Sequence, residues 1–481
     1  MHALRLRPRS AFQLLYTALA AFTAVGCSGA QKIPVDLLIV GGRTIDPGSG
    51  SIQDGAVLAI DDGKIVAIES DRSKFAAEKT IEASGKFVIP SFADMHVHWG
   101  NGTFAEDNDL VRSTLARNLY YGVTRILNMG SNSASPADID AFRRKLSSGE
   151  WQGPTIYAVG ALITVPGSHP TTTIFPPPLQ KQIAQTVAAA PERGPIDLMP
   201  LRAITLVRTP DDVRVEVRRL AKWGADAVKL TIESGPGPFG DDHPQMSEEI
   251  VQAAVEEAHA AKIPVIAHIS SRDDLDICLR TGVDAAAHAA ISGPFDTELH
   301  KAMGAARFFY VATLGLYDGF LNWTADPTRM DDPLLRETLT DGEVASMQGS
   351  ARVFERERTF FGKIGLRPLM HHVRDAHRAG AILLTGTDTG NPFAFPGFDV
   401  HEELRLLVEA GIEPLDALAA ATANPAEFLG EADRWGSIAV GQAADLLVLD
   451  ADPTVDIMST RRIARVIQHG RVVDRAGLAV R

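Results

Sequence analysis

Residues 90–98 read PSFADMHVH, a short apolar segment that carries two histidines, His96 and His98. In a β-strand, successive side chains alternate between the two faces, so both imidazoles point the same way. Two imidazoles on one face, one strand repeat apart, can bind a single metal ion. Two hydrogen-bonded histidines at a strand end would give the same pattern, so the rest of the chain has to distinguish the two readings.

Seven more short apolar, β-rich runs follow this segment, and helical patterns separate most of them. In residues 247–262 (SEEIVQAAVEEAHAAK), apolar residues recur at helical spacing, Ser247 stands at the N-cap position and acidic residues fill the first turn. Strand and helix repeated eight times predict an α/β fold, the (β/α)8 or TIM barrel. The gaps after the third and seventh runs are longer than βα loops need, so we expect lids or substrate-binding insertions there. The eight strand runs cover residues 92–98, 122–130, 155–163, 227–234, 263–270, 283–290, 307–315 and 381–388.

Segments of β character also stand at both ends of the chain. Asp61-Asp62-Gly63 separates two β-rich runs and predicts a hairpin. Residues 436–477 return to β character after the last helical pattern, so we predict that both ends build one small β-sandwich domain. The predicted organisation is a signal peptide over residues 1–27, a tether over 28–34, the N-terminal half of the β-sandwich over 35–90, the barrel over 91–434 and the C-terminal half of the β-sandwich over 435–481.

The first residues carry a targeting signal. Three arginines precede an apolar run at residues 11–25, which is too short for a comfortable membrane span and is typical of a signal peptide. The following AVGC resembles a bacterial lipobox with Cys27 as the lipidated residue, although Ala24 stands where leucine is usual. We therefore expect an exported bacterial protein, periplasmic or anchored to the outer membrane as a lipoprotein; an ordinary cleaved signal peptide is the alternative.

Composition narrows the possible partners. The formal net charge is −13, from 47 Lys and Arg against 60 Asp and Glu, and this disfavours nucleic acid. We expect a small-molecule substrate, and contact with a membrane only through a lipid on Cys27. If Cys27 is lipidated or removed, Cys278 is the one cysteine left, so no intrachain disulfide can form, and we expect Cys278 to be a buried helix residue.

Six polar residues stand at or near the ends of five of the strand runs. In a (β/α)8 barrel, catalytic residues gather at the C-terminal ends of the strands. Each of these residues alone could be a snorkelling lysine, a turn-forming aspartate or a core histidine, but together they predict a metal site. They are His96 and His98 in the first run, Lys229 in the fourth, His268 in the fifth, His288 in the sixth and Asp388 in the eighth.

With these motifs the sequence resembles the amidohydrolase superfamily, especially its imidazolonepropionase-like and Xaa-Pro-dipeptidase-like branch. The resemblance covers nearly the whole mature chain and implies a metal-bearing barrel beside a β-sandwich made from both chain ends. The motifs that carry it are VGGRTIDPG (40–48), VIPSFADMHVH (88–98), GADAVKL (224–230), the two later histidine runs, GTDTG (386–390), ATANPAEFLG (421–430) and GSIAVGQAADLLVLD (436–450).

The resemblance also implies roles for the strand-end residues. Lys229 matches a lysine that carbon dioxide converts to a carbamate, which bridges two divalent metal ions; an unmodified lysine beside a single ion is the alternative. Asp388 would take the proton from a metal-bridging hydroxide as it attacks the substrate, and pass it to the leaving nitrogen. Zinc fits nitrogen and oxygen ligands, and Mn, Co, Fe and Ni are also compatible. The implied ligands are His96, His98 and Asp388 for one ion, and His268 and His288 for the second.

The two insertions hold the candidate substrate residues. His169 in PGSHP would lie at the mouth of the site, where it could bind substrate or stabilise an oxyanion; a solvated loop histidine is the alternative. Tyr317 and other aromatic residues of the second insertion would line an apolar pocket, or pack as a lid instead. Leu127-Asn128 stands where relatives often have an Arg-Asp pair, so dipeptide specificity does not transfer directly.

The resulting hypothesis is a metal-dependent hydrolase of C–N amide bonds, acting on a dipeptide, an N-acyl amino acid or a cyclic amide. One alternative is a deaminase, or a hydrolase of esters, lactones or phosphoesters, on the same metal site. Another is a non-catalytic binding protein, which the retention of every metal-ligand position disfavours.

Overall fold

The computed structural model describes residues 32–98, 109–130, 136–198, 204–233, 235, 237 and 243–479. The predicted signal peptide, Cys27 and the first residues of the predicted tether lie outside these ranges. In the part of the chain that the structure describes, none of the helices combines the length and apolar character that crossing a bilayer requires.

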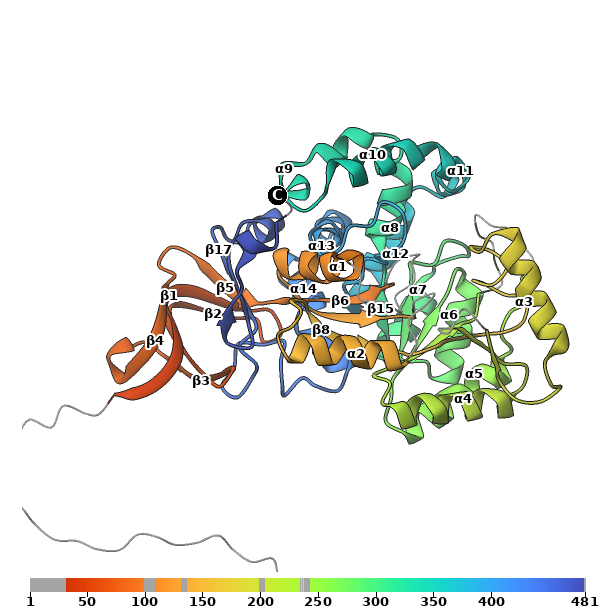
Figure 1. Ribbon diagram of the computed structural model, residues 1–481, viewed down its shortest axis with the longest axis horizontal. Helices are drawn as coiled ribbons and strands as arrows, with labels where there is room; N and C mark the ends of the chain where they lie inside the picture. The colour runs from red at the N-terminus through yellow and green to blue at the C-terminus, as the bar shows by residue number, and fades with distance from the viewer. Residues whose placement is uncertain are drawn as a thin grey trace, which may run out of the picture.

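The eight predicted strand runs form the barrel (Figure 1). All neighbouring pairs among these strands are parallel, and a bridge between Val97 and Thr389 joins the last run to the first. The third run is divided into two strands at Gly160, which has a positive φ of 76° and lies too close to Leu220 for a side chain. The strands are β6 (Phe92–Val97), β7 (Val123–Asn128), β8 (Thr155–Ala158), β9 (Leu162–Thr164), β12 (Val228–Thr231), β13 (Val265–His268), β14 (Ala285–Ala287), β15 (Phe309–Val311) and β16 (Ile382–Leu384).

Helices cover the outside of the barrel. The helix expected over residues 247–262 is confirmed as α5 (Glu248–Ala260), with Ser247 at the N-cap but without a side-chain capping bond. Cys278 is buried in α6 (Arg272–Thr281), as expected. The other covering helices are α1 (Asp109–Tyr120), α2 (Pro136–Ser147), α4 (Pro210–Trp223), α7 (Thr297–Ala305), α12 (Leu366–Arg378), α13 (Phe398–Ala410), α14 (Pro414–Ala420) and α15 (Ala423–Phe428).

Both chain ends contribute strands to one eight-stranded sheet beside the barrel, where β5 pairs antiparallel with β17 (Figure 1). The predicted hairpin joins β2 to β3, and Asp62 and Gly63 at its turn both have positive φ. Leu58 and Val57 point to opposite faces of the sheet, and each face buries its own apolar cluster. The strands are β1 (Ile33–Asp46), β2 (Ser51–Asp61), β3 (Lys64–Glu69), β4 (Phe75–Glu82), β5 (Phe87–Pro90), β17 (Leu446–Leu449), β18 (Ile463–Gln468) and β19 (Arg471–Val472).

The two expected insertions are present. The first follows β9 and contains α3 (Pro177–Ala189), β10 (Ile196–Asp197) and β11 (Ile204–Leu206). The second follows β15, and α9 to α11 of this insertion lie together at the top of Figure 1. Its helices are α8 (Leu314–Asp318), α9 (Pro333–Arg336), α10 (Asp341–Ser350) and α11 (Glu355–Ile364), with a π-helical turn at Gly319–Trp323 and 3-10 turns at Pro327–Asp331 and Ala351–Phe354.

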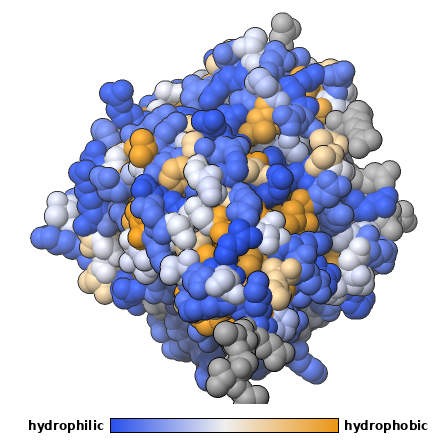
Figure 2. Space-filling model, turned by 90° about the vertical axis from the view of Figure 1, so that its left-hand side faces the viewer, coloured by the Kyte–Doolittle hydropathy of each residue, from blue (hydrophilic) through white to orange (hydrophobic). Residues whose placement is uncertain are grey.

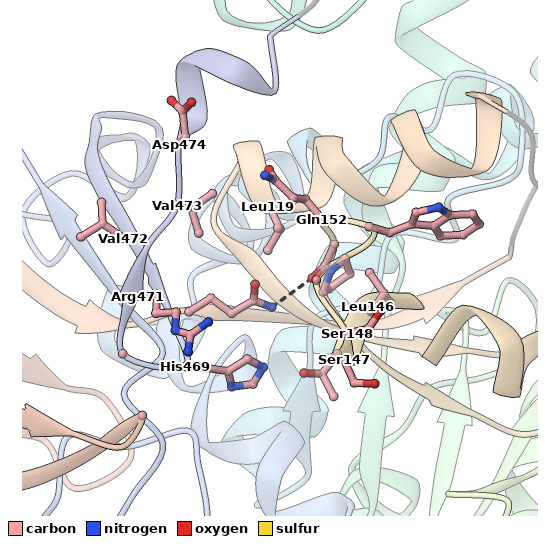
Figure 3. A pocket seen from close by; sticks show the side chains of 18 of the residues that line it. Leu119, Leu146, Ser147, Ser148, Gln152, His469, Arg471, Val472, Val473 and Asp474 are labelled. Carbon is pink, nitrogen blue, oxygen red and sulfur yellow. Dashed lines mark hydrogen bonds between the residues drawn. The ribbon is translucent and has the colours of Figure 1, made fainter. Parts of the chain in front are cut away.

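A pocket of about 1200 Å³ lies between the β18–β19 hairpin and the loop that leads into β8 (Figure 3). Gln468 donates a hydrogen bond across it to the carbonyl of Gly153 (3.1 Å). Thr155 and Asp226, at or just before the starts of β8 and β12, also line it, so it lies at the opposite end of the barrel from the strand-end histidines. The surface in Figure 2 is largely polar, with hydrophobic residues in small groups.

Candidate metal centre

The structure brings the strand-end residues together around Asp388, which follows β16. Asp388 Oδ1 lies 3.4 Å from His96 Nε2 and 3.3 Å from His98 Nε2, and these two nitrogens are 3.1 Å apart. His288 Nδ1 is 3.9 Å from Asp388 Oδ2, and the ring centroids of His288 and His268 are 4.4 Å apart. Parallel strands end at the same side of a barrel, so four strand ends converge here.

Hydrogen bonds at Nδ1 orient the rings of His98 and His288. His98 Nδ1 donates to the carbonyl of Gly130, so its Nε2 keeps a lone pair that faces Asp388. His288 Nδ1 is 2.9 Å from the Thr313 hydroxyl. Metal-binding histidines commonly have such a partner on the other ring nitrogen. His98 therefore already presents the nitrogen that a metal ion needs.

Tight backbone geometry holds Asp388 against the first strand. Its φ is 57°, and its amide donates to the carbonyl of His96 (2.8 Å). Gly386 and Gly390 on either side approach His96 and His98 too closely for any side chain. The GTDTG motif therefore has glycines where the ends of strands β6 and β16 touch. Non-glycine residues with a positive φ, such as Asp388, cluster at functional sites.

Asp94 holds the same turn from within the barrel. It is fully buried, and it accepts hydrogen bonds from the amide (3.0 Å) and hydroxyl (2.6 Å) of Thr387 and from the amide of His96 (3.2 Å). Burial raises the pKa of Asp94 to about 7. Because both carboxylate oxygens are occupied by these bonds, Asp94 positions the ligands without being one.

Lys229 lies in β12 and is 1% exposed. Its Nζ has no hydrogen-bond partner among the described residues, and neither has Asp388 Oδ1. Burial lowers the pKa of Lys229 to about 7, although the carboxylates of Asp388 and Glu233 act to raise it. Buried polar groups without partners are rare in folded proteins. The unpaired atoms and the nitrogen and oxygen donors fit divalent metal ions.

Glu233 is a site residue that the sequence prediction missed. It follows β12, and side chains alternate along a strand, so Lys229, Thr231 and Glu233 share one face. Glu233 Oε2 lies 3.0 Å from His268 Nε2, and Oε1 lies 3.3 Å from His169 Nδ1. Its position on the same strand face as Lys229 is the signal that could have revealed it.

His169 lies at the site, as predicted for the first insertion. Its ring stacks on His268 with centroids 4.6 Å apart, and its Nδ1 is 2.7 Å from the Thr173 hydroxyl. Thr164, the last residue of β9, donates its hydroxyl to the carbonyl of His169 (2.8 Å). The described ligand-type atoms thus fall into two groups, one of His96, His288 and Asp388 and one of His169, Glu233 and His268.

The aromatic residues Tyr317, Phe320 and Trp323 of the second insertion are buried among other side chains. Phe320 and Trp323 are buried and pack against other rings, so packing accounts for them. Tyr317 is 4% exposed, and its hydroxyl donates to the carbonyl of Ala289 (2.8 Å). This hydrogen bond gives Tyr317 a structural role, and its contact with substrate stays a prediction.

We expect Tyr317→Phe to destabilise the fold by about 1 kcal/mol, because the carbonyl of Ala289 loses its hydrogen-bond donor. The kcat/KM should stay within about twofold of the wild-type value, since the ring still packs in the same place. Urea unfolding and steady-state kinetics measure both effects. A tenfold rise in KM would show instead that the hydroxyl binds substrate.

Comparisons with known proteins agree with this geometry. The model of the amidohydrolase family matches residues 87–473. Imidazolonepropionase from Geobacillus sp. (strain WCH70) is 23% identical over 441 residues, 89% of this chain and 91% of that protein. Dihydroorotases from Trichlorobacter lovleyi and Streptococcus pneumoniae are 38% and 36% identical over 82 and 112 residues, 17% and 23% of this chain. The matches span only 19% and 26% of those two relatives.

Among solved structures, a Xaa-Pro dipeptidase with bound methionine aligns with a TM-score of 0.68 at 24% identity, covering 91% of this chain and 99% of that one. That likeness shows the shared fold. The barrel gathers histidines, a lysine and an aspartate at its strand ends, and this donor set suits divalent metal ions. The family match covers most of the sequence, and the chain belongs to the amidohydrolase family.

Proposed function

We propose that the protein hydrolyses C–N amide bonds with the help of divalent metal ions, and that its substrate is a dipeptide, an N-acyl amino acid or a cyclic amide. The observation that carries the proposal is the convergence of His96, His98 and His288 on Asp388 at the strand ends. The protein's membership of the amidohydrolase family supports the same reaction class.

The donor set suits two ions. Lys229 would hold both as a carbamate, since a buried amine without a hydrogen-bond partner among the described residues, with its pKa lowered to about 7 by burial, is suited to react with carbon dioxide. Such ions supply Lewis acidity, which lowers the pKa of water and polarises a carbonyl. Zinc is the first choice for these ligands. One ion would use His96, His98 and Asp388, and the other His268 and His288.

Asp388 is the residue placed to move the proton. Its Oδ1 is buried, has no hydrogen-bond partner among the described residues and faces the two Nε2 atoms of the HxH pair. A carboxylate there can accept a proton from the attacking water and return it to the leaving nitrogen. Asp94 and Thr387 hold the turn that carries it, so the carboxylate needs little reorganisation during the reaction.

The Leu127-Asn128 run has a positioning role here. Asn128 Oδ1 accepts a hydrogen bond from the amide of Gly130 (2.9 Å), and the carbonyl of Gly130 accepts from His98 Nδ1. Asn128 thereby supports the ring of His98. Because the fold is similar to that of a Xaa-Pro dipeptidase, dipeptides are the first substrate class to test. Because Leu127-Asn128 replaces the Arg-Asp pair of relatives, the panel must also include other amides.

The proposal is tested by assaying a substrate panel with protein loaded with zinc in bicarbonate. The panel contains Xaa-Pro and other dipeptides, N-acyl amino acids and cyclic amides. Release of free amino acid or ring-opened product supports it. Ammonia release from a heterocycle would instead establish the deaminase alternative, and ester or lactone hydrolysis without amide hydrolysis would establish that reaction class.

We also propose export and lipid attachment at Cys27, supported by the signal-like N-terminus and the AVGC run. In bacteria that express the full chain, Cys27→Ala should lose fatty-acid label and leave the membrane fraction. Cys278→Ala is the matched control and should keep both, because Cys278 is buried in α6. A labelled Cys27→Ala protein would refute lipid attachment at this residue.

A further inference from the structure

Glu233 is a nearly buried carboxylate at the metal centre without an Arg or Lys partner within 4.0 Å among the described residues. Its side chain is 12% exposed, and its ion-pair contacts are with His268 and His169. A carboxylate in so enclosed a place is costly unless its oxygens are hydrogen-bonded. Oε2 is hydrogen-bonded to His268 Nε2, and Oε1 lies 3.3 Å from His169 Nδ1, whose hydrogen-bond partner is the Thr173 hydroxyl.

The bond to His268 decides which nitrogen of that ring is free. A carboxylate only accepts, so His268 Nε2, at 3.0 Å, carries the hydrogen, and Nδ1 keeps its lone pair. His98 follows the same logic with an uncharged acceptor, the Gly130 carbonyl, whereas the Thr313 hydroxyl at His288 can donate or accept. A charged acceptor holds the tautomer and raises the basicity of the ring more strongly.

The second oxygen of Glu233 reaches the entrance loop. His169 Nδ1 is 3.3 Å from Glu233 Oε1, and the imidazoles of His169 and His268 lie nearly parallel, with an interplanar angle of 20°. His169 belongs to the first insertion, whereas His268 ends a barrel strand. Glu233 therefore connects a residue at the mouth of the site to a residue inside it.

We propose that Glu233 is a positioning residue that orients His268 for metal binding and connects it to His169 on the entrance loop. This inference rests on the proposed metal-dependent function. The same three residues could instead bind a separate ion, since their ligand-type atoms lie within 4.8 Å of one another. The 3.0 Å hydrogen bond between Glu233 and His268 and the stacking of His169 on His268 favour the positioning role.

The test compares wild type, Glu233→Gln, Glu233→Asp and His169→Gln, with Glu256→Gln as the matched surface control. Glu256 lies in α5 and contacts Arg214 of α4, so the pair joins two of the helices that cover the barrel. Zinc content and zinc affinity are measured by titration against a competing chelator, and cobalt loading reports coordination through its absorption spectrum. These readouts do not depend on knowing the substrate.

We expect Glu233→Gln to fold, to bind one zinc ion as the wild type does and to bind the second about 10- to 100-fold more weakly. Glu233→Asp should recover part of that affinity, because it keeps the charge. His169→Gln should leave both zinc affinities unchanged and raise KM or lower kcat, since His169 lies on the substrate side of the bridge.

Unchanged affinity for both ions in Glu233→Gln would overturn the proposal. A third zinc ion in the wild type, lost together in Glu233→Gln and His169→Gln, would also overturn it and make Glu233 a ligand. A wild-type protein that binds no zinc or other divalent ion would contradict the proposed function itself, which separates that failure from the failure of this inference.

Discussion

Asp388→Asn is expected to retain its metal ions and yet lose about 100- to 10,000-fold in kcat, the range that a positioned proton carrier contributes. The asparagine amide keeps an oxygen near the Nε2 atoms of His96 and His98, but it cannot accept and return a proton. The measurement is kcat at saturating zinc on whichever panel substrate the wild type hydrolyses, together with zinc content of the same samples.

Asp416→Asn is the matched control for this substitution. Asp416 also faces a histidine, with Oδ2 3.2 Å from His377 Nε2, but it is half exposed on the barrel exterior. Its variant should match the wild type in zinc content and kcat. Full activity in Asp388→Asn would refute the proton-transfer role. Loss of zinc along with activity would assign the residue to metal binding alone.

Much of the fold could be predicted because apolar runs and turn residues act locally. Five of the strand runs carry polar residues that the open end of a barrel accommodates, and Asp62-Gly63 supplies the positive φ that a tight hairpin needs. The structure adds the division of the third run at Gly160, which depends on the close approach of α4. Such an approach leaves no periodic signal in the sequence.

The site residues that could be predicted are those with metal-binding side chains at the ends of apolar strand runs. Site residues outside such positions could not be identified from the sequence. Glu233 lies two residues after Thr231, the last residue of β12. From the sequence alone, a glutamate at this position could equally be a solvent-exposed residue at the end of a strand. Its partners His268 and His169 are distant in sequence, so only the folded chain shows them. Tyr317 illustrates the reverse case, because an aromatic residue in an insertion can line a pocket or pack, and burial decides between these.

Lys229→Met should produce the second large effect. Methionine fills nearly the same volume in β12, but it has no nitrogen that can take up carbon dioxide. We expect the variant to hold at most one zinc ion tightly and to lose about 1000-fold in kcat, which corresponds to roughly 4 kcal/mol of lost transition-state stabilisation. Zinc content and kcat are measured with and without added bicarbonate.

Bicarbonate separates the two readings of Lys229. If the amine becomes a carbamate, bicarbonate should raise zinc content and kcat in the wild type, leave Lys229→Met unaffected, and add a ¹³C carbamate resonance when labelled carbon dioxide is supplied. Lys222→Met, at an exposed position in α4, should respond as the wild type does. If Lys229→Met instead keeps its metal content and the wild type ignores bicarbonate, Lys229 is an unmodified amine beside a single ion. In that case the unpaired Nζ would face the substrate, and His268 with Glu233 would belong to substrate binding as well.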